Sequence, residues 1–156
     1  MPKLKTPEQV YDECMEKGFM QEQELVNIDK IRTMMDFANA LEMSAREIMK
    51  GLDKKDMKWS VVYTLHYDAL HELAEAFVAL DKKKIFNHQC LFSYLIIKHP
   101  ELVFDWNFLE KIRTQRNGMH YYGSFANYND WKEVEAQFKI YINALRKAVK
   151  DKINKD

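Results

Sequence analysis

The chain has 156 residues, of which 47% are hydrophobic and 31% charged, and its formal net charge is zero. This length predicts one domain with a sizeable core, and the balanced charge excludes the overall basic field that many nucleic-acid-binding domains carry. Only 4 Gly and 3 Pro are present, too few for the many turns of an all-β fold of this size, so the composition favours an all-α protein.

The apolar segments and the cysteines both bear on the cellular compartment. No apolar run approaches the roughly 20 residues of a transmembrane helix, and no signal-peptide core lies at the N-terminus. Two cysteines, Cys14 and Cys90, are too few for a disulfide framework or a zinc site. We therefore expect two buried free thiols in a cytoplasmic protein that does not contact a membrane.

Capping signals open the first predicted helices. Residues 6–9 form a capping box, with proline at the first helical position, and Gly18 ends this helix. Apolar periodicity predicts a second helix over about 22–41. A further capping box at 44–47 predicts a separate short helix that stops near Gly51.

A long central helix follows. Asp56 is expected to cap it, and its apolar residues over about 57–81 cover more than one stripe, which predicts neighbours on several sides. The lysines at 82–84 are interpreted as a solvated connection. Asn87 caps a short, very apolar helix that Pro100 closes.

The last two helices complete an up-and-down bundle of about six helices. Asp105 is expected to cap the fifth, and Gly123 allows the chain to leave it with a positive φ. A polar link at 124–129 precedes a capping box at 130–133, which is expected to open the final helix, running to about residue 150.

Arginine, amide and histidine side chains gather near the end of the fifth predicted helix. Arg113, Arg116 and His120 are spaced i, i+3, i+7 and share one stripe, with Asn117 on its shoulder. Arginine binds phosphate oxygens bidentately, and histidine can accept a proton from a ribose 2′-hydroxyl or donate one to a leaving oxygen. These four residues are the predicted catalytic set, and they need no metal or cofactor.

Three aromatic residues flank this set. Trp106, Tyr121 and Tyr122 are candidate nucleotide-binding residues because aromatic rings stack on bases. A structural interpretation stays open beside the functional one. In it the aromatic rings belong to the core and the arginines pair with acids such as Glu110 or Asp105.

The other histidines predict no metal site. His66 and His71 are spaced i, i+5, which differs from the i, i+4 spacing of helical metal ligands. His88 lies close to Cys90, but nothing local indicates an activated thiol.

The motif resembles the signature of the HEPN superfamily, helical domains named for higher eukaryotes and prokaryotes nucleotide-binding. In that family an arginine is usually followed by a polar residue, and four to six residues then separate it from a histidine. Arg113, with six intervening residues to His120, satisfies this spacing. Arg116-Asn117 is similar to the arginine–polar pair, although only three residues separate Arg116 from His120.

Two further stretches carry the resemblance. Residues 62–76 resemble the central helix of prokaryotic members, and residues 87–91 resemble the helix that follows it. The resemblance implies a four- to five-helix core, which we place at 55–150, and it leaves the N-terminal helices at 1–54 of the single expected domain, 1–156, unmatched. It also implies a homodimer with the motif helices facing each other.

Three functions are consistent with this sequence. The first is a metal-independent ribonuclease, often a toxin in this family, neutralised by a nucleotidyltransferase-fold antitoxin. The second is a non-catalytic module that binds a nucleotide or such a partner through the same groove, which the neutral net charge and the short Arg116–His120 spacing favour. The third is a purely structural helical interaction domain.

Overall fold

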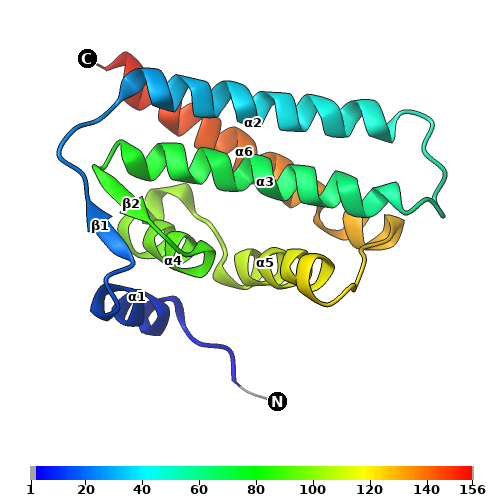
Figure 1. Ribbon diagram of the computed structural model, residues 1–156, viewed down its shortest axis with the longest axis horizontal. Coiled ribbons are helices and arrows are strands. Elements are labelled where there is room, and N and C mark those ends of the chain that lie inside the picture. The colour runs from blue at the N-terminus through cyan, green and yellow to red at the C-terminus, as the bar shows by residue number, and fades with distance from the viewer. Residues whose placement is uncertain (1–2, 156) are drawn as a thin grey trace.

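The computed structural model describes residues 3–155, which form an all-α bundle with one small β-ribbon (Figure 1). The elements follow the order α1 (Pro7–Glu16), β1 (Met20–Glu22), α2 (Ile28–Met49), α3 (Lys58–Ala79), β2 (Lys83–Ile85), α4 (His88–Lys98), a 3₁₀ turn (Pro100–Leu102), α5 (Trp106–Tyr121) and α6 (Tyr128–Asn154). The predicted all-α class is confirmed.

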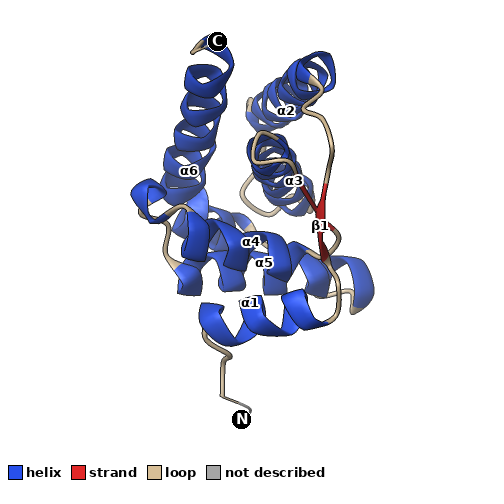
Figure 2. Ribbon diagram, turned by 90° about the vertical axis from the view of Figure 1, so that its left-hand side faces the viewer, coloured by secondary structure: helices blue, strands red, loops and turns tan. Residues whose placement is uncertain are grey.

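Helix α3 lies at the centre and packs against α2, α4, α5 and α6. Helices α2, α3 and α6 occupy one side of the molecule, and α1, α4 and α5 occupy the other (Figure 2). Large α3 side chains such as Tyr63, Tyr67 and Phe77 are fully buried. The broad apolar surface of this segment therefore predicts its central position correctly.

Several helix starts agree with the sequence signals. Thr6 accepts the Gln9 N–H at 3.1 Å, and the Gln9 side chain accepts the Thr6 N–H at 3.0 Å. Asn87 accepts the Cys90 N–H at 3.1 Å, and Asp105 accepts the Asn107 N–H at 3.2 Å. In each case a side-chain oxygen satisfies a backbone donor that the first helical turn leaves free.

Helix α2 differs from the prediction at both ends. It runs unbroken from Ile28 to Met49, so the separate helix predicted from residues 44–47 is wrong. The buried positions Ala38, Glu42 and Ala45 continue one helical stripe through that capping signal. The packing of this stripe against α3 stabilises a continuous helix, and this outweighs the local capping signal at residues 44–47.

Two predictions are wrong because a β-ribbon occupies both segments. Helix α2 does not start at residue 22, and the lysines at 82–84 are not only a solvated connection. Met20 pairs with Ile85, and Glu22 pairs with Lys83, in the antiparallel ribbon β1–β2. Ile85 is buried, and the flanking Gln23 N–H donates to the Lys82 carbonyl at 2.8 Å. Two three-residue strands that pair across some sixty residues leave no periodic signal in either segment.

The last helix begins three residues earlier than residues 130–133 predict. Asn127 and Asp130 form a reciprocal capping box, with both backbone-to-side-chain hydrogen bonds at 2.9 Å. Helix α6 therefore starts at Tyr128, whose ring packs edge-on against Trp59 at a centroid distance of 5.0 Å.

Cys14 and Cys90 form a disulfide bond, so the expectation of two free thiols is wrong. The bond joins α1 to α4, with 5.8 Å between the two Cα atoms, and both residues are buried as expected. The sequence does not reveal the bond because 76 residues separate two cysteines that only the packing of α1 on α4 brings together.

Asp81 joins three helix ends. Its carboxylate accepts hydrogen bonds from the Tyr94 hydroxyl at 3.0 Å and from Lys152 at 3.0 Å, and it lies 2.5 Å from His99 Nε2. The ends of α3, α4 and α6 thus share one polar connection.

Candidate functional site

Helix α5 and its C-cap residue Tyr122 carry the residues that the sequence analysis predicts for the site. Leu109, Ile112 and Met119 bury one face of the helix. At the C-terminal end, the Gly118 carbonyl accepts the N–H groups of Tyr122 and Ser124, both at 3.0 Å. Gly123 then leaves the helix at φ +65°, the positive φ that its sequence position predicts.

Arg113 is held by an acid on its own helix. Its Nε and Nη2 donate to the two carboxylate oxygens of Glu110, at 3.0 and 2.8 Å. Glu110 is buried and also accepts a hydrogen bond from Gln89 at 2.9 Å. A bidentate pair of this kind occupies the guanidinium face that would otherwise meet a phosphate.

Arg116 has a looser environment. Its Nη2 lies 3.6 Å from Asp68 on α3, and its guanidinium carbon lies 5.5 Å from the centre of the Tyr67 ring. Its Nε–H is buried and has no hydrogen-bond partner among residues 3–155. An unsatisfied buried donor costs free energy, so the guanidinium of Arg116 is less completely paired than that of Arg113.

The charges of Arg116 and His120 both act on Asp68 of α3. Burial raises the pKa of the Asp68 carboxyl above its ordinary value, while Arg116 and His120 act in the opposite direction. His120 is exposed and lines an apolar hollow of about 270 Å³ that includes Val61 and Phe125. Arg116 and His120 therefore lie on the same side of α5.

Asn117, Tyr121 and Tyr122 line a different surface. They border a shallow hollow of about 710 Å³ together with Arg113. Tyr121 and Tyr122 are 72% and 83% exposed, so both rings are accessible to a ligand. The single stripe predicted from sequence is thus divided in the structure, with Arg116 and His120 in one row and Arg113 and Asn117 in the next.

Trp106 lies apart from the other predicted residues. It is buried, and its indole N–H donates to the Lys5 carbonyl at 2.9 Å. With a rise of 1.5 Å per residue, about 21 Å of helix separates it from His120. The structure does not bring Trp106 to this surface.

The sequence analysis missed a polar cluster beside Arg116. The rings of His71 on α3 and His88 on α4 lie with centroids 3.8 Å apart, and His88 Nδ1 is 2.9 Å from the Tyr67 hydroxyl. These histidines line a cavity of about 270 Å³ with Arg116 and Phe37. No sequence spacing could find the cluster, because it depends on how three helices meet.

The two histidines of this cluster are uncharged near neutral pH. Burial lowers the pKa of His71 to about 3, and the nearby His88 and Arg116 add to the effect. Burial also lowers the pKa of His88, again with a contribution from Arg116. Arg116 is therefore the fixed cation of this surface, flanked by neutral imidazoles that can donate or accept hydrogen bonds.

Within residues 3–155, no group of three or more His, Cys, Asp or Glu side chains is arranged to hold a metal ion. None of the helices in the same range combines the length and apolar character needed to cross a bilayer. Comparisons with family models, with curated proteins and with solved structures give no match for this chain.

Proposed function

We propose that this protein is a HEPN-type domain that binds RNA phosphates at the second half of α5 and cleaves RNA without a metal ion. The state of Arg116 carries the proposal. Its nearest carboxylate oxygen is 3.6 Å away, and its buried Nε–H has no partner among the described residues. His120 lies one helical turn further on, where its imidazole can reach a phosphate that Arg116 holds.

Each residue takes a role that its surroundings permit. Arg116 binds the phosphate oxygens in place of Asp68 and stabilises the charge that develops in the transition state. His120 accepts the proton of the 2′-hydroxyl or donates one to the 5′-oxygen. The exposed rings of Tyr121 and Tyr122 stack on neighbouring bases, and Asn117 donates its amide hydrogen bonds from the adjacent row.

A homodimer is part of the proposal. Phe125 is 58% exposed and adjoins the hollow that contains His120, close in sequence to the exposed Tyr121 and Tyr122. Two motif helices facing each other across a two-fold axis would cover these aromatic rings and bring two Arg116 side chains to one groove. If the protein is a toxin of this type, its antitoxin partner in the cell is a nucleotidyltransferase-fold protein.

Cleavage of single-stranded RNA in EDTA tests the enzyme proposal. We expect the wild type to release products with 2′,3′-cyclic phosphate ends, and His120→Ala to lower the rate by about 10²–10⁴-fold. Arg116→Ala should also abolish most activity. Lys111→Ala removes a cation from the same helix, where it pairs with Glu133 at 2.8 Å, and should keep the wild-type rate.

Three outcomes would count against this proposal. RNA left intact by the wild type would contradict the proposed ribonuclease activity. A monomeric mass in analytical ultracentrifugation would contradict the proposed homodimer. Equal rates for wild type and His120→Ala would assign any cleavage to another residue or to a contaminant.

A non-catalytic module is the second candidate, and the pairing of Arg113 favours it. Glu110 already occupies that guanidinium bidentately, so the site has one loosely held arginine where the sequence suggests two. In this case labelled RNA, a nucleotide or the nucleotidyltransferase-fold partner binds without cleavage. Arg116→Ala weakens that binding in fluorescence anisotropy, and Lys111→Ala does not.

A further inference from the structure

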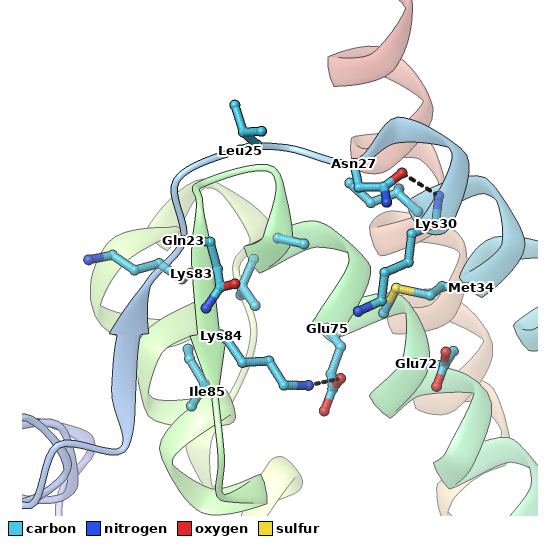
Figure 3. Close-up of a pocket in the computed structure, with 13 residues that line it drawn as sticks. Gln23, Leu25, Asn27, Lys30, Met34, Glu72, Glu75, Lys83, Lys84 and Ile85 are labelled. Carbon is cyan, nitrogen blue, oxygen red and sulfur yellow. Dashed lines mark hydrogen bonds and ion pairs between the residues drawn. The ribbon is translucent and has the colours of Figure 1, made fainter.

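A second pocket lies between α2, α3, β2 and the linker at residues 23–27 (Figure 3). Its volume is about 390 Å³, within the range of pockets that bind small molecules. Its floor is apolar and consists of Ile31, Met34, Val78, Ala79 and Ile85. None of the residues proposed for the α5 site lines this pocket.

Some charges around the pocket are already paired. Lys84 donates to Glu75 at 3.1 Å across the pocket wall (Figure 3). The Lys83 ammonium pairs with Glu22 and projects away from the cavity in the same view. These two lysines therefore have partners within the protein.

Lys30 and Glu72 remain as an unpaired cation and an unpaired anion. Neither forms an ion pair with another residue in the described part of the chain. The Lys30 side chain extends from α2 toward the middle of the pocket, and Glu72 lies on the α3 wall (Figure 3). The pocket thus offers one positive and one negative group above an apolar floor.

The surroundings of each group favour an opposite charge from a ligand. Burial and the neighbouring Glu75 raise the pKa of Glu72, so a ligand cation would relieve an unfavourable carboxylate. Lys30 lies in the first turn of α2, whose N-terminal dipole end also attracts anions. The Gln23 amide lines the pocket on the side of β2 and offers a further hydrogen-bond donor there (Figure 3).

We propose that this pocket binds a small zwitterion with an apolar side chain, of the α-amino acid class. The ligand carboxylate contacts Lys30, and the ligand ammonium contacts Glu72. The side chain lies on the floor formed by α2, α3 and β2. Opposite charges on one small ligand match the two unpaired groups, whereas a simple anion or a simple cation would leave one of them unused.

Isothermal titration calorimetry on the full chain tests this assignment with three matched compounds. Leucine carries both charges, isopentylamine lacks the carboxylate, and 4-methylpentanoate lacks the ammonium. We expect leucine, or another apolar amino acid in a small panel, to bind at least about tenfold more tightly than its two truncated counterparts. Binding should also raise the melting temperature.

Variants locate the binding in this pocket. Lys30→Met and Glu72→Gln should each weaken amino-acid binding by about tenfold. Lys83→Met is the matched control, because that ammonium projects away from the cavity, and it should bind like the wild type. Circular dichroism melts show whether each variant is folded before its affinity is compared.

Several results would overturn the proposal. The absence of binding by every apolar amino acid would do so, as would equal affinity for leucine and 4-methylpentanoate, which would indicate an anion site. Unchanged affinity in both Lys30→Met and Glu72→Gln would place the ligand elsewhere. None of these measurements uses RNA, so the result is independent of the function proposed for α5.

Discussion

The pairing of Arg113 with Glu110 leads to a stability prediction. Arg113→Ala would leave the buried Glu110 carboxylate without its cation, so we expect the free energy of unfolding to fall by about 3 kcal/mol in urea titrations. Lys111→Ala breaks only an exposed pair with Glu133 and should cost at most about 1 kcal/mol. Similar losses in both variants would mean that Arg113 is free to meet a ligand.

Residues that act within one helix could be identified from the sequence, and residues that act across helices could not. The helical repeat places Arg113, Arg116 and His120 near one another along α5. It contains no information about Asp68 or His71, which approach from α3. Glu110, the acid that holds Arg113, lies one turn earlier on the same helix and could be named from the sequence, whereas the surroundings of Arg116 emerge only from the packing.

The disulfide between α1 and α4 gives a prediction for these elements. A covalent link across 76 residues restricts the unfolded chain, and the loop-entropy model assigns about 4.5 kcal/mol to a loop of that length. We expect dithiothreitol to lower the urea midpoint of the wild type accordingly. The double variant Cys14→Ser/Cys90→Ser should start at the lower midpoint and not respond to reductant. An unchanged wild-type midpoint on reduction would contradict this contribution.

Helix boundaries show which signals are reliable for whole elements. Thr6, Asn87 and Asp105 are correctly predicted as caps because their signals coincide with a real break in the apolar pattern. The box at 44–47 fails because the buried stripe of α2 continues through it. The ribbon at 20–22 and 83–85 escapes prediction because each strand is formed only by pairing with the other.

Histidine burial makes the stability of the whole molecule depend on pH. Burial lowers the pKa of His66, His71 and His88 in the folded state, that of His71 to about 3. Below about pH 6.5 the unfolded chain binds protons that these folded sites do not. The free energy of unfolding therefore decreases as the pH is lowered, by up to about 1.4 kcal/mol per pH unit for each histidine. His71→Gln should reduce this slope between about pH 6.5 and 5 in urea titrations.

His99 contributes with the opposite sign. Burial disfavours its charged form, but its contacts with Asp81 and Glu101 together outweigh this and raise the pKa of His99. Its contribution is complete below the unfolded pKa and is lost as pH rises through the folded one. His99→Gln should therefore lower stability at acid pH, where the charged imidazole stabilises the fold, and remove the loss of stability that the wild type shows as the pH rises through the folded pKa. For His71, the contradicting result would be parallel curves of unfolding free energy against pH for the wild type and His71→Gln, which would show that His71 does not cause the loss of stability at acid pH.

The disulfide also closes a covalent ring that contains the exposed turn between α2 and α3, at residues 50–57. A protease that cuts this turn divides the polypeptide into one fragment with α1 and α2 and another with the remaining helices. Because Cys14 and Cys90 lie on different fragments, the two pieces migrate as one species in a denaturing gel without reductant and separate when it is added. A nicked molecule would thus keep both walls of the amino-acid pocket tethered to each other.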